Sequence, residues 1–318
     1  MSTLLPFIAK RLVQGVLVVW GVVTTVFLLR FLSPTNPAVL IAPEDATAET
    51  IRQIEEELGL NEPILVQYAD FLIRAVQGDL GFSYASNTAV TGRVLGSLGA
   101  TLELAFASLL FAIVISIPLG ILSAKHRGSK IDYGSNLLSL GGLSTPNFWL
   151  AIMMVLVVSV QLGVLPTSGR PFGPTENVTS WVAHMILPTI ALGTYFMALL
   201  FRMTRNGVIE ESGKEYVTAA RGKGLPEPLI MYRYILQNSL APVVTVAGLQ
   251  LGVLIGGSVV VEAVFAWPGL GSMFIRALNS ADWPIIQGVL IVVGVGYVAI
   301  NIVVDIINAQ LNPQVAMS

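Results

Sequence analysis

The sequence has no cysteine, only two histidines and few charged residues of either sign. Without cysteine the chain can form neither disulfides nor thiolate metal sites, and it has no cysteine nucleophile. His126 and His184 are too few for a histidine-built metal centre. Only 11% of the 318 residues are charged, whereas soluble domains average about a quarter. The net charge of −2 leaves no basic field for nucleic acid.

Hydrophobic residues are abundant instead, at 54% of the chain with a mean hydropathy of +0.76. This composition excludes an ordinary soluble or disordered protein and predicts an all-α integral membrane protein, because a spanning helix needs about 20 apolar residues. The uncharged runs are too long for barrel strands. Six transmembrane helices are predicted, over residues 12–32, 101–124, 135–162, 184–203, 239–262 and 283–307. We expect the first to be an uncleaved anchor, since no signal-peptide cleavage site follows it.

The basic residues set the expected orientation. Eleven of the seventeen Lys and Arg residues fall on the side of the two termini, which predicts that both termini are cytoplasmic. A long extracytoplasmic loop over residues 33–97 then carries nine of the nineteen acids. Within it, residues 47–58 and 64–76 are predicted to be helices that end near Gly59 and Gly78. Acidic runs are usually only solvated, so a solvated cap is favoured over a docking surface for an extracytoplasmic partner.

The cytoplasmic loop over residues 202–238 is the most informative segment. Residues 215–220 favour a helix, Gly222 and Gly224 are expected to break it, and Pro226 can start a second helix. A protruding helix–turn–helix is therefore predicted. Several apolar residues are expected on its surface, which indicates a protein partner: Leu225, Ile230 and Met231.

The stretch Glu215-Tyr-Val-Thr-Ala-Ala-Arg-Gly-Lys-Gly224, with Pro242 downstream, resembles the EAA motif of ABC importer permeases. Residues 78–83, 144–150 and 262–271 are similar to segments of the dipeptide/oligopeptide/nickel group, and the long loop after the first span resembles its first permease subunit. Two places depart from the family pattern. Ala281-Asp-Trp-Pro284 stands where Arg-Asp-Tyr-Pro is favoured, and Asn312-Pro-Gln314 where Asp-Pro-Arg is favoured.

This resemblance implies the type I ABC importer permease fold as one transmembrane domain over residues 1–318, in a prokaryotic inner or plasma membrane. It implies a second homologous permease, two cytoplasmic ATPase subunits that hold ATP and magnesium, and an extracytoplasmic substrate-binding protein. No catalytic, cofactor-binding or metal residue is expected in this chain. Short peptides are the first choice of substrate, and nickel or another small solute is the alternative. The residues expected to couple to the ATPases are Glu215, Ala219, Ala220, Arg221, Gly224 and Pro242.

Three glycines in the fifth predicted span form a smooth helix face, because they are spaced four apart: Gly248, Gly252 and Gly256. The face is expected either at the interface with the second permease or the pore, or in packing within this subunit. The spacing does not decide between the two.

The position of charge separates the remaining alternatives. A secondary transporter or channel driven by an ion gradient would usually bury an acid in mid-membrane, whereas Glu103, Glu262 and Asp305 are expected near span ends, within reach of headgroups or water. An intramembrane protease would need a Ser–His or paired-Asp site, but there is no Gly-x-Ser-x-Gly motif and His184 lies at a span edge. The chain has no phosphate-binding loop of its own, which favours energy supplied by a partner.

Overall fold

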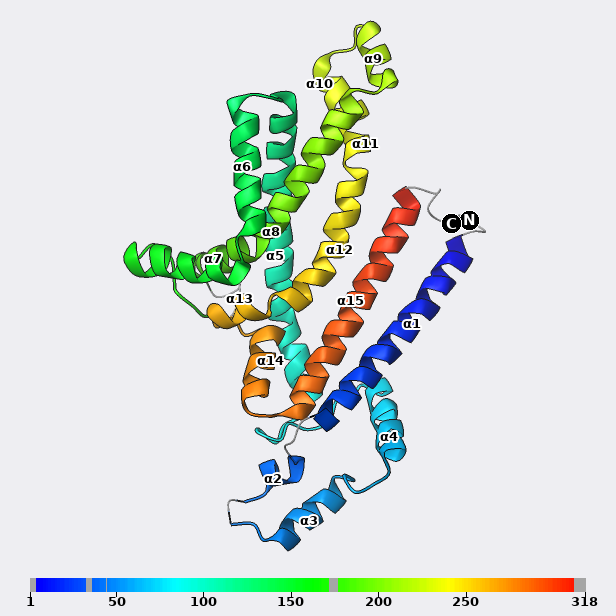
Figure 1. Ribbon diagram of the computed structural model, residues 1–318, viewed down its shortest axis with the longest axis vertical. Coiled ribbons are helices and arrows are strands. Elements are labelled where there is room, and N and C mark those ends of the chain that lie inside the picture. The colour runs from blue at the N-terminus through cyan, green and yellow to red at the C-terminus, as the bar shows by residue number, and fades with distance from the viewer. Residues whose placement is uncertain (1–3, 33–35, 44, 172–176, 312–318) are drawn as a thin grey trace. The chain divides into compact units, whose positions relative to one another are not determined.

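The computed structural model describes residues 4–32, 36–43, 45–171 and 177–311, and these are helical apart from turns and one isolated β-bridge between Phe82 and Ala89 (Figure 1). The predicted all-α class is confirmed. The longer helices are α1 (Leu4–Leu29), α5 (Val90–Lys125), α6 (Lys130–Ser144), α8 (Val178–Ser212), α12 (Ala241–Gly257) and α15 (Trp283–Leu311). The shorter ones include α2 (Pro37–Ile41), α3 (Ala48–Glu57), α4 (Ile64–Val76), α7 (Asn147–Met154), α13 (Val259–Val264) and α14 (Leu270–Asn279).

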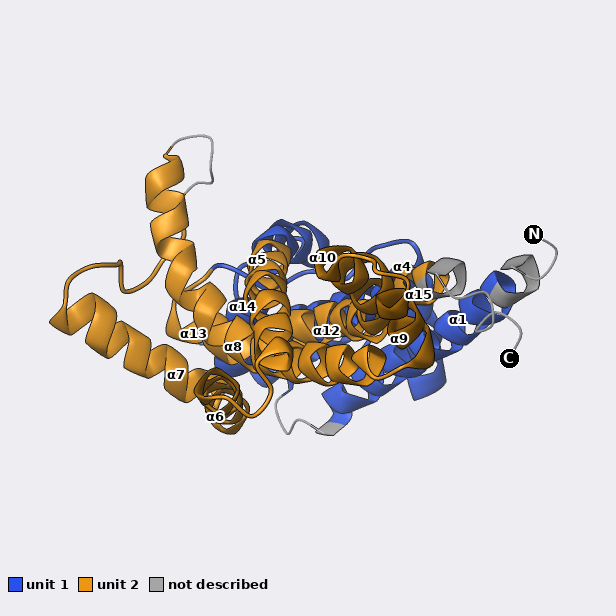
Figure 2. Ribbon diagram, turned by 90° about the horizontal axis from the view of Figure 1, so that it is seen from above, with its two compact units in different colours: residues 1–101, 268–302 blue, residues 102–267, 303–318 orange. Residues whose placement is uncertain are grey.

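The chain forms two compact units, which Figure 2 shows in different colours. Unit 1 comprises residues 1–101 and 268–302, and unit 2 comprises residues 102–267 and 303–318. The boundaries between the units fall inside α5, between α13 and α14, and inside α15. A single domain over residues 1–318 stays a prediction.

Four helical segments in the described part of the chain are long and apolar enough to cross a membrane: Ile8–Leu29, Val90–Lys125, Val178–Ser212 and Trp283–Ile307. Two further helix pairs pass the same test together but are bent, Lys130–Ser144 with Asn147–Gln161 by 101° and Glu227–Ser239 with Ala241–Gly257 by 47°. If each bent pair is one span, the number reaches the six that the sequence predicts.

The third predicted span, over residues 135–162, is not one straight helix. It breaks between α6 and α7 at Thr145, whose backbone is extended (φ −89°, ψ 121°). Pro146 follows, and a proline both lacks the N–H that would continue the helix and disfavours helical geometry at the residue before it. The right-angle bend therefore has a local cause that a hydropathy window does not register.

Unit 1 is built around α1 and the first part of α15, which run antiparallel. Gly294 of α15 approaches so closely that a Cβ there would lie 2.8 Å from Val22, and the Gln287 amide donates to the Val26 carbonyl at 3.2 Å. α4 packs on the C-terminal part of α1, near Val23 and Val26. The start of α5, with Val90 and Val94, packs against α14 and α15 in a second cluster.

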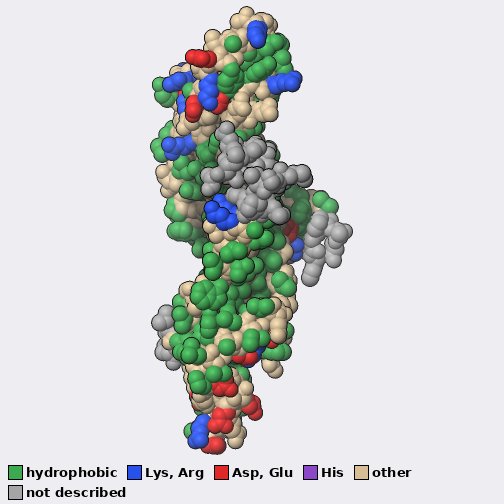
Figure 3. Space-filling model, turned by 90° about the vertical axis from the view of Figure 1, so that its right-hand side faces the viewer, with side chains coloured by type: hydrophobic (Ala, Val, Ile, Leu, Met, Phe, Trp, Pro, Cys, Tyr) green, Lys and Arg blue, Asp and Glu red, His purple; other side chains and the backbone are tan. Residues whose placement is uncertain are grey.

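The two loop helices predicted over residues 47–58 and 64–76 are confirmed as α3 and α4. The Thr47 side chain accepts from the Thr50 amide and caps α3, while Gly59 and Gly78 follow the two helices with φ of +65° and +77°. These left-handed conformations favour glycine because it has no Cβ. In Figure 3 a group of acidic side chains lies in the lower part of the visible face, where Figure 1 places α3.

Unit 2 is organised around α8, which packs against α6, α7, α12 and α13. α5 lies parallel to it, since Gly193 of α8 adjoins Phe111 and Gly120 of α5 adjoins Thr204. Large apolar side chains on α5 and α6, such as Leu110 and Leu138, are exposed. Hydrophobic side chains cover much of the visible face in Figure 3, as expected for helices that face lipid.

Candidate functional site

The 202–238 loop begins inside a helix rather than in a loop. α8 continues to Ser212, nine residues beyond the end of the predicted fourth span, and so forms a rigid stem. A short turn at Gly213 leads into α9 (Glu215–Gly222), and α10 (Glu227–Leu229), the π-helical segment η3 (Ile230–Leu236) and α11 (Gln237–Ser239) return to α12. The predicted helix–turn–helix is confirmed in this form.

The turn after α9 is set by Gly224. Its φ is +73°, and the backbone bonds from Gly224 N to Arg221 O (2.9 Å) and from Leu225 N to Ala220 O (3.3 Å) close the end of the helix. The prediction that Gly224 interrupts the helix is confirmed. Gly222, which was also expected to break the helix, is instead its last residue. A single glycine at a helix end is enough for the left-handed cap.

A small hydrophobic core holds α9 onto the stem. Its buried members come from α8, α9 and η3: Val208, Val217, Ala220, Ile230, Met231 and Ile235. The prediction that Ile230 and Met231 are exposed is wrong, because they are 0% and 7% exposed, and Leu225 is partly buried against the same core. The hairpin of helices buries these side chains itself, so they are not evidence for a partner.

A polar joint fixes the start of α9. The Tyr216 hydroxyl donates to the Glu211 carboxylate at the end of α8, and it accepts from Asn238 Nδ2 at 3.1 Å. Lys214 forms an ion pair with the same carboxylate, which raises the pKa of the Lys214 amine. Burial and the neighbouring Glu211 raise the pKa of the Tyr216 phenol above its ordinary value of 10.0. The joint ties α9 to both α8 and α11.

The predicted coupling residues of α9 divide between its two faces. Glu215 and Ala219 are exposed, whereas Ala220 is buried in the hydrophobic core. Arg221 is exposed but pairs with Glu227 of the same loop, with 2.8 Å between Arg221 Nε and Glu227 Oε1. The structure therefore leaves Glu215 and Ala219 on the outward face and gives Ala220 and Arg221 partners within the chain.

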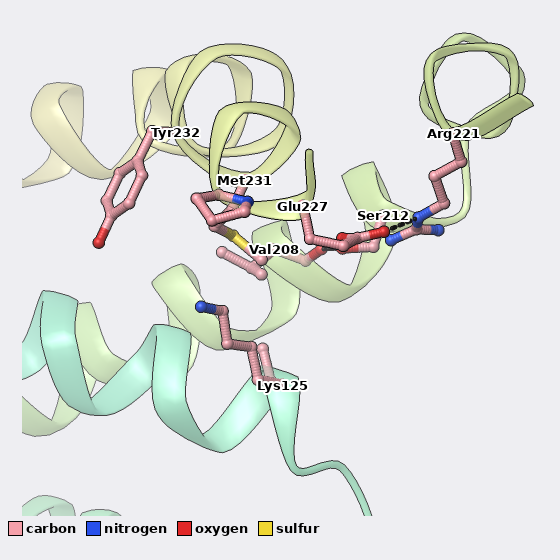
Figure 4. Close-up of a pocket in the computed structure, with 9 residues that line it drawn as sticks. Lys125, Val208, Ser212, Arg221, Glu227, Met231 and Tyr232 are labelled. Carbon is pink, nitrogen blue, oxygen red and sulfur yellow. Dashed lines mark hydrogen bonds and ion pairs between the residues drawn. The ribbon is translucent and has the colours of Figure 1, made fainter. Parts of the chain in front are cut away.

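A cavity of about 620 Å³ lies beneath the loop (Figure 4). Lys125 at the end of α5 and Tyr232 of η3 reach toward it, and the Arg221–Glu227 ion pair lies on its rim. Part of the loop's inner surface is thus not packed against α5. α9 is held mainly by its core with α8 and η3 and by the polar joint.

A buried ion pair braces the stem itself. Arg205 of α8 donates through Nε to Asp132 Oδ1 (2.7 Å) and through Nη2 to Oδ2 (2.9 Å), with side chains 17% and 6% exposed. The carboxylate also accepts from Ser123, Gly128 and Asn136. The pair connects the turn between α5 and α6 to α8 ten residues before α9 begins. Sequence reasoning missed it, although Ser129 with Asp132 is a capping pattern at the start of a helix.

Pro242 lies in the first turn of α12, where its missing N–H costs nothing. The three glycines of α12 do not share one environment. A Cβ on Gly248 would lie 2.6 Å from Val304 of α15, Gly252 is buried, and Gly256 is exposed. Gly248 therefore packs within this subunit, and a partner-facing or pore-facing role for Gly256 stays a prediction.

A second polar cluster occupies the other end of unit 2. Arg170 donates through Nε (2.9 Å) and Nη2 (2.6 Å) to Glu103 of α5, and Trp181 of α8 donates to the same carboxylate. The Arg170 guanidinium lies 5.7 Å from the centre of the Trp267 ring. The cluster ties the segment after η2 (Val155–Gln161) to two spanning helices.

Glu262 differs from its predicted setting. It was expected within reach of headgroups or water, but it is completely buried on α13, and its Oε1 accepts from Ser258 at 2.8 Å. α13 packs against α7 and α8. α13 begins directly after Ser258, and it directs the Glu262 side chain into the protein. The predicted span boundaries alone do not indicate this direction.

The chain matches two family models, "Binding-protein-dependent transport system inner membrane component" over residues 116–317 and its N-terminal counterpart over residues 4–105. It is 37% identical to the dipeptide transport system permease protein DppB of Alkalihalophilus pseudofirmus (98% of this chain, 99% of the relative). It is 37% identical to the oligopeptide transport system permease protein AppB of Bacillus subtilis (97% and 98%), and 35% identical to DppB of Escherichia coli (98% and 99%).

Among solved structures, the chain resembles an inward-facing conformation of the MetNI methionine ABC transporter with a TM-score of 0.55 at 21% identity. The match covers 69% of this chain and 96% of that one. A likeness at this identity shows the fold alone, which this chain shares with the matched chain of that ABC transporter.

Proposed function

The chain belongs to the family of binding-protein-dependent transport system inner membrane components, and we propose that it is a permease subunit of an ATP-driven peptide importer. It forms one half of the translocation pathway beside a second, homologous permease. The two chains are multi-pass proteins of a prokaryotic plasma membrane, with both termini in the cytoplasm. The relatives named above are dipeptide and oligopeptide permeases, which supports peptides over nickel or another small solute.

The observation that carries this proposal is the construction of the 202–238 loop. A coupling element must transmit force, so it has to be rigid and firmly joined to a spanning helix. α9 meets this requirement through its own hydrophobic core, the polar joint at Tyr216 and the continuous stem of α8. Its outward face, with Glu215 and Ala219, stays free for a partner.

Two cytoplasmic ATPase subunits dock on the α9 helices of the two permeases, and they hold the ATP and magnesium. ATP hydrolysis there moves α9, and α8 carries the movement into the membrane. An extracytoplasmic binding protein delivers the peptide and sets most of the selectivity. This chain performs no chemistry of its own, in keeping with the transport permeases that it resembles.

The test is uptake of a labelled peptide by proteoliposomes that contain both permeases, the ATPases and the binding protein. Uptake is expected with ATP and not with a non-hydrolysable analogue. Uptake that continues without hydrolysis would refute the proposal in favour of a secondary transporter. Uptake of nickel but not of peptide would support the ATP-driven mechanism but show that the substrate is nickel rather than a peptide.

A further inference from the structure

α4 carries more apolar surface than its contacts within the chain require. One face packs on α1: Phe71 and Tyr68 have ring centroids 5.4 and 5.2 Å from that of Phe27, and Leu72 and Ala75 adjoin the cluster around Val23. These residues recur at the helical spacing of three and four. This face accounts for only part of the apolar side chains of the helix.

The neighbouring face of α4 is also apolar but is uncovered within unit 1. It consists of residues spaced four, four and three apart: Leu65, Ala69, Ile73 and Val76. The exposed fractions of Leu65, Ile73 and Val76 are 77%, 58% and 88%. A helix surrounded by water would place polar residues here, so this stripe requires a cover.

The position of α4 along α1 indicates what covers this apolar stripe. The Tyr68 hydroxyl lies 2.6 Å from Thr24 Oγ1, and Thr24 comes five residues before Leu29, where the part of α1 that is long and apolar enough to span a membrane ends. At 1.5 Å per residue, the contact lies about 7 Å inside the end of the span. α4 therefore lies beside the last turns of a lipid-facing helix, where Leu28 is 53% exposed.

The polar residues of α4 point elsewhere. Gln67, Asp70 and Arg74 line a cavity of about 590 Å³ within unit 1, where the Gln67 amide donates to the carbonyls of Leu60 and Glu62 at 3.0 and 2.8 Å. Asp70 and Arg74 pair with each other one turn apart. The polar face of α4 is therefore directed toward its own unit, and its second apolar face is directed outward.

From these observations we propose that α4 is an interfacial helix, with Leu65, Ile73 and Val76 inserted among the lipids of the leaflet at the Leu29 end of α1. A helix with one apolar face buried about 5–10 Å below the headgroups is a known way to hold a loop on a membrane. The extramembrane loop is then divided into a half fixed on lipid, α4, and an acidic half in water, α3. The proposal depends on α1 being a span and not on what the protein transports.

The absence of native cysteine makes the test direct. Leu65→Cys, Ile73→Cys and Val76→Cys are each spin-labelled in the full-length chain, reconstituted with its partner subunits in lipid nanodiscs. Collision of the label with oxygen, which concentrates in lipid, is compared with collision with a water-soluble nickel chelate. Leu28→Cys on α1 is the lipid-facing reference, and Arg52→Cys on α3 is the water-facing control.

The oxygen-to-nickel collision ratio at the three positions is expected to match that of Leu28→Cys and to exceed that of Arg52→Cys several-fold. All five substituted side chains are exposed within the chain, so folding should persist. Each variant is included only if it co-purifies with its partners. A ratio like that of Arg52→Cys would overturn the proposal, because the stripe would face water. Protection from both reagents would also overturn it, because a protein partner would then cover the stripe.

Discussion

Replacing Asp132 by asparagine tests whether the stem of the 202–238 loop depends on its buried ion pair. The native carboxylate accepts two hydrogen bonds from Arg205 and one each from Ser123, Gly128 and Asn136. Asparagine has nearly the same shape, but it is neutral and presents a single acceptor oxygen. The variant therefore leaves the Arg205 guanidinium, whose side chain is 17% exposed, without its counter-charge.

The expected loss is large for one substitution. Removing one partner of a buried ion pair costs about 3–5 kcal/mol, and the lower end applies because asparagine preserves the packing. For a compact unit of this size, about 3 kcal/mol corresponds to a fall of about 6–12 °C in the unfolding midpoint. The assay is thermal unfolding of the purified chain in detergent, together with peptide-stimulated ATP hydrolysis by the assembled complex.

Arg221→Gln is the matched control, because it breaks an exposed ion pair whose side chains are 44% and 64% exposed. Its cost should stay below about 1 kcal/mol. A double variant, Asp132→Asn with Arg205→Gln, should recover part of the loss, since no unpaired charge remains buried. If Asp132→Asn shifts the midpoint no more than Arg221→Gln does, the buried pair is not what braces the stem.

Three further outcomes follow. The folded state raises the pKa of the Tyr216 phenol above its ordinary value of 10.0. The phenol therefore contributes stability at a pH below 10.0, and this contribution is lost as the pH rises above that value. Tyr216→Phe should flatten the alkaline fall in the unfolding midpoint. Gly224→Asp, at a φ of +73°, should strain the turn by about 1–3 kcal/mol and reduce ATP-driven uptake while membrane insertion persists; normal uptake by a well-expressed variant would contradict this. Gly248→Ala should lower the midpoint by an amount equivalent to about 1–3 kcal/mol, because the new Cβ meets Val304 at 2.6 Å, and an unchanged midpoint would show that Val304 moves aside freely.

Local signals predicted local structure well. α3 and α4 begin and end where a capping threonine and following glycines place them, and the end of α9 is set by Gly224. The bend at Pro146 shows the limit of hydropathy, because a window average does not register one residue that interrupts a helix. Exposure was harder to predict than helix position. Ile230 and Met231 lie in a segment that mixes charged and apolar residues, and they are buried in a core that includes Val208 of α8 and Val217 of α9.

The ion pairs that brace the site could not be predicted either, because each joins residues that are far apart in the sequence. Asp132 and Arg205 are separated by 73 residues, and Glu103 and Arg170 by 67. One sequence gives each charge but not its partner, which depends on how the helices pack. The coupling residues were predicted from a resemblance, and only the structure separates the outward Ala219 from the buried Ala220.

The docking of an ATPase on α9 is the central claim, and site-directed cross-linking tests it most directly. Ala219→Cys would be the only cysteine of the chain, and its position on α9 is exposed. A photo-cross-linker attached there, in membranes that contain the assembled transporter, is expected to join this chain to an ATPase subunit, whereas the same reagent at Arg52→Cys on α3 should not. Efficient labelling at position 219 without any adduct to an ATPase would contradict the account.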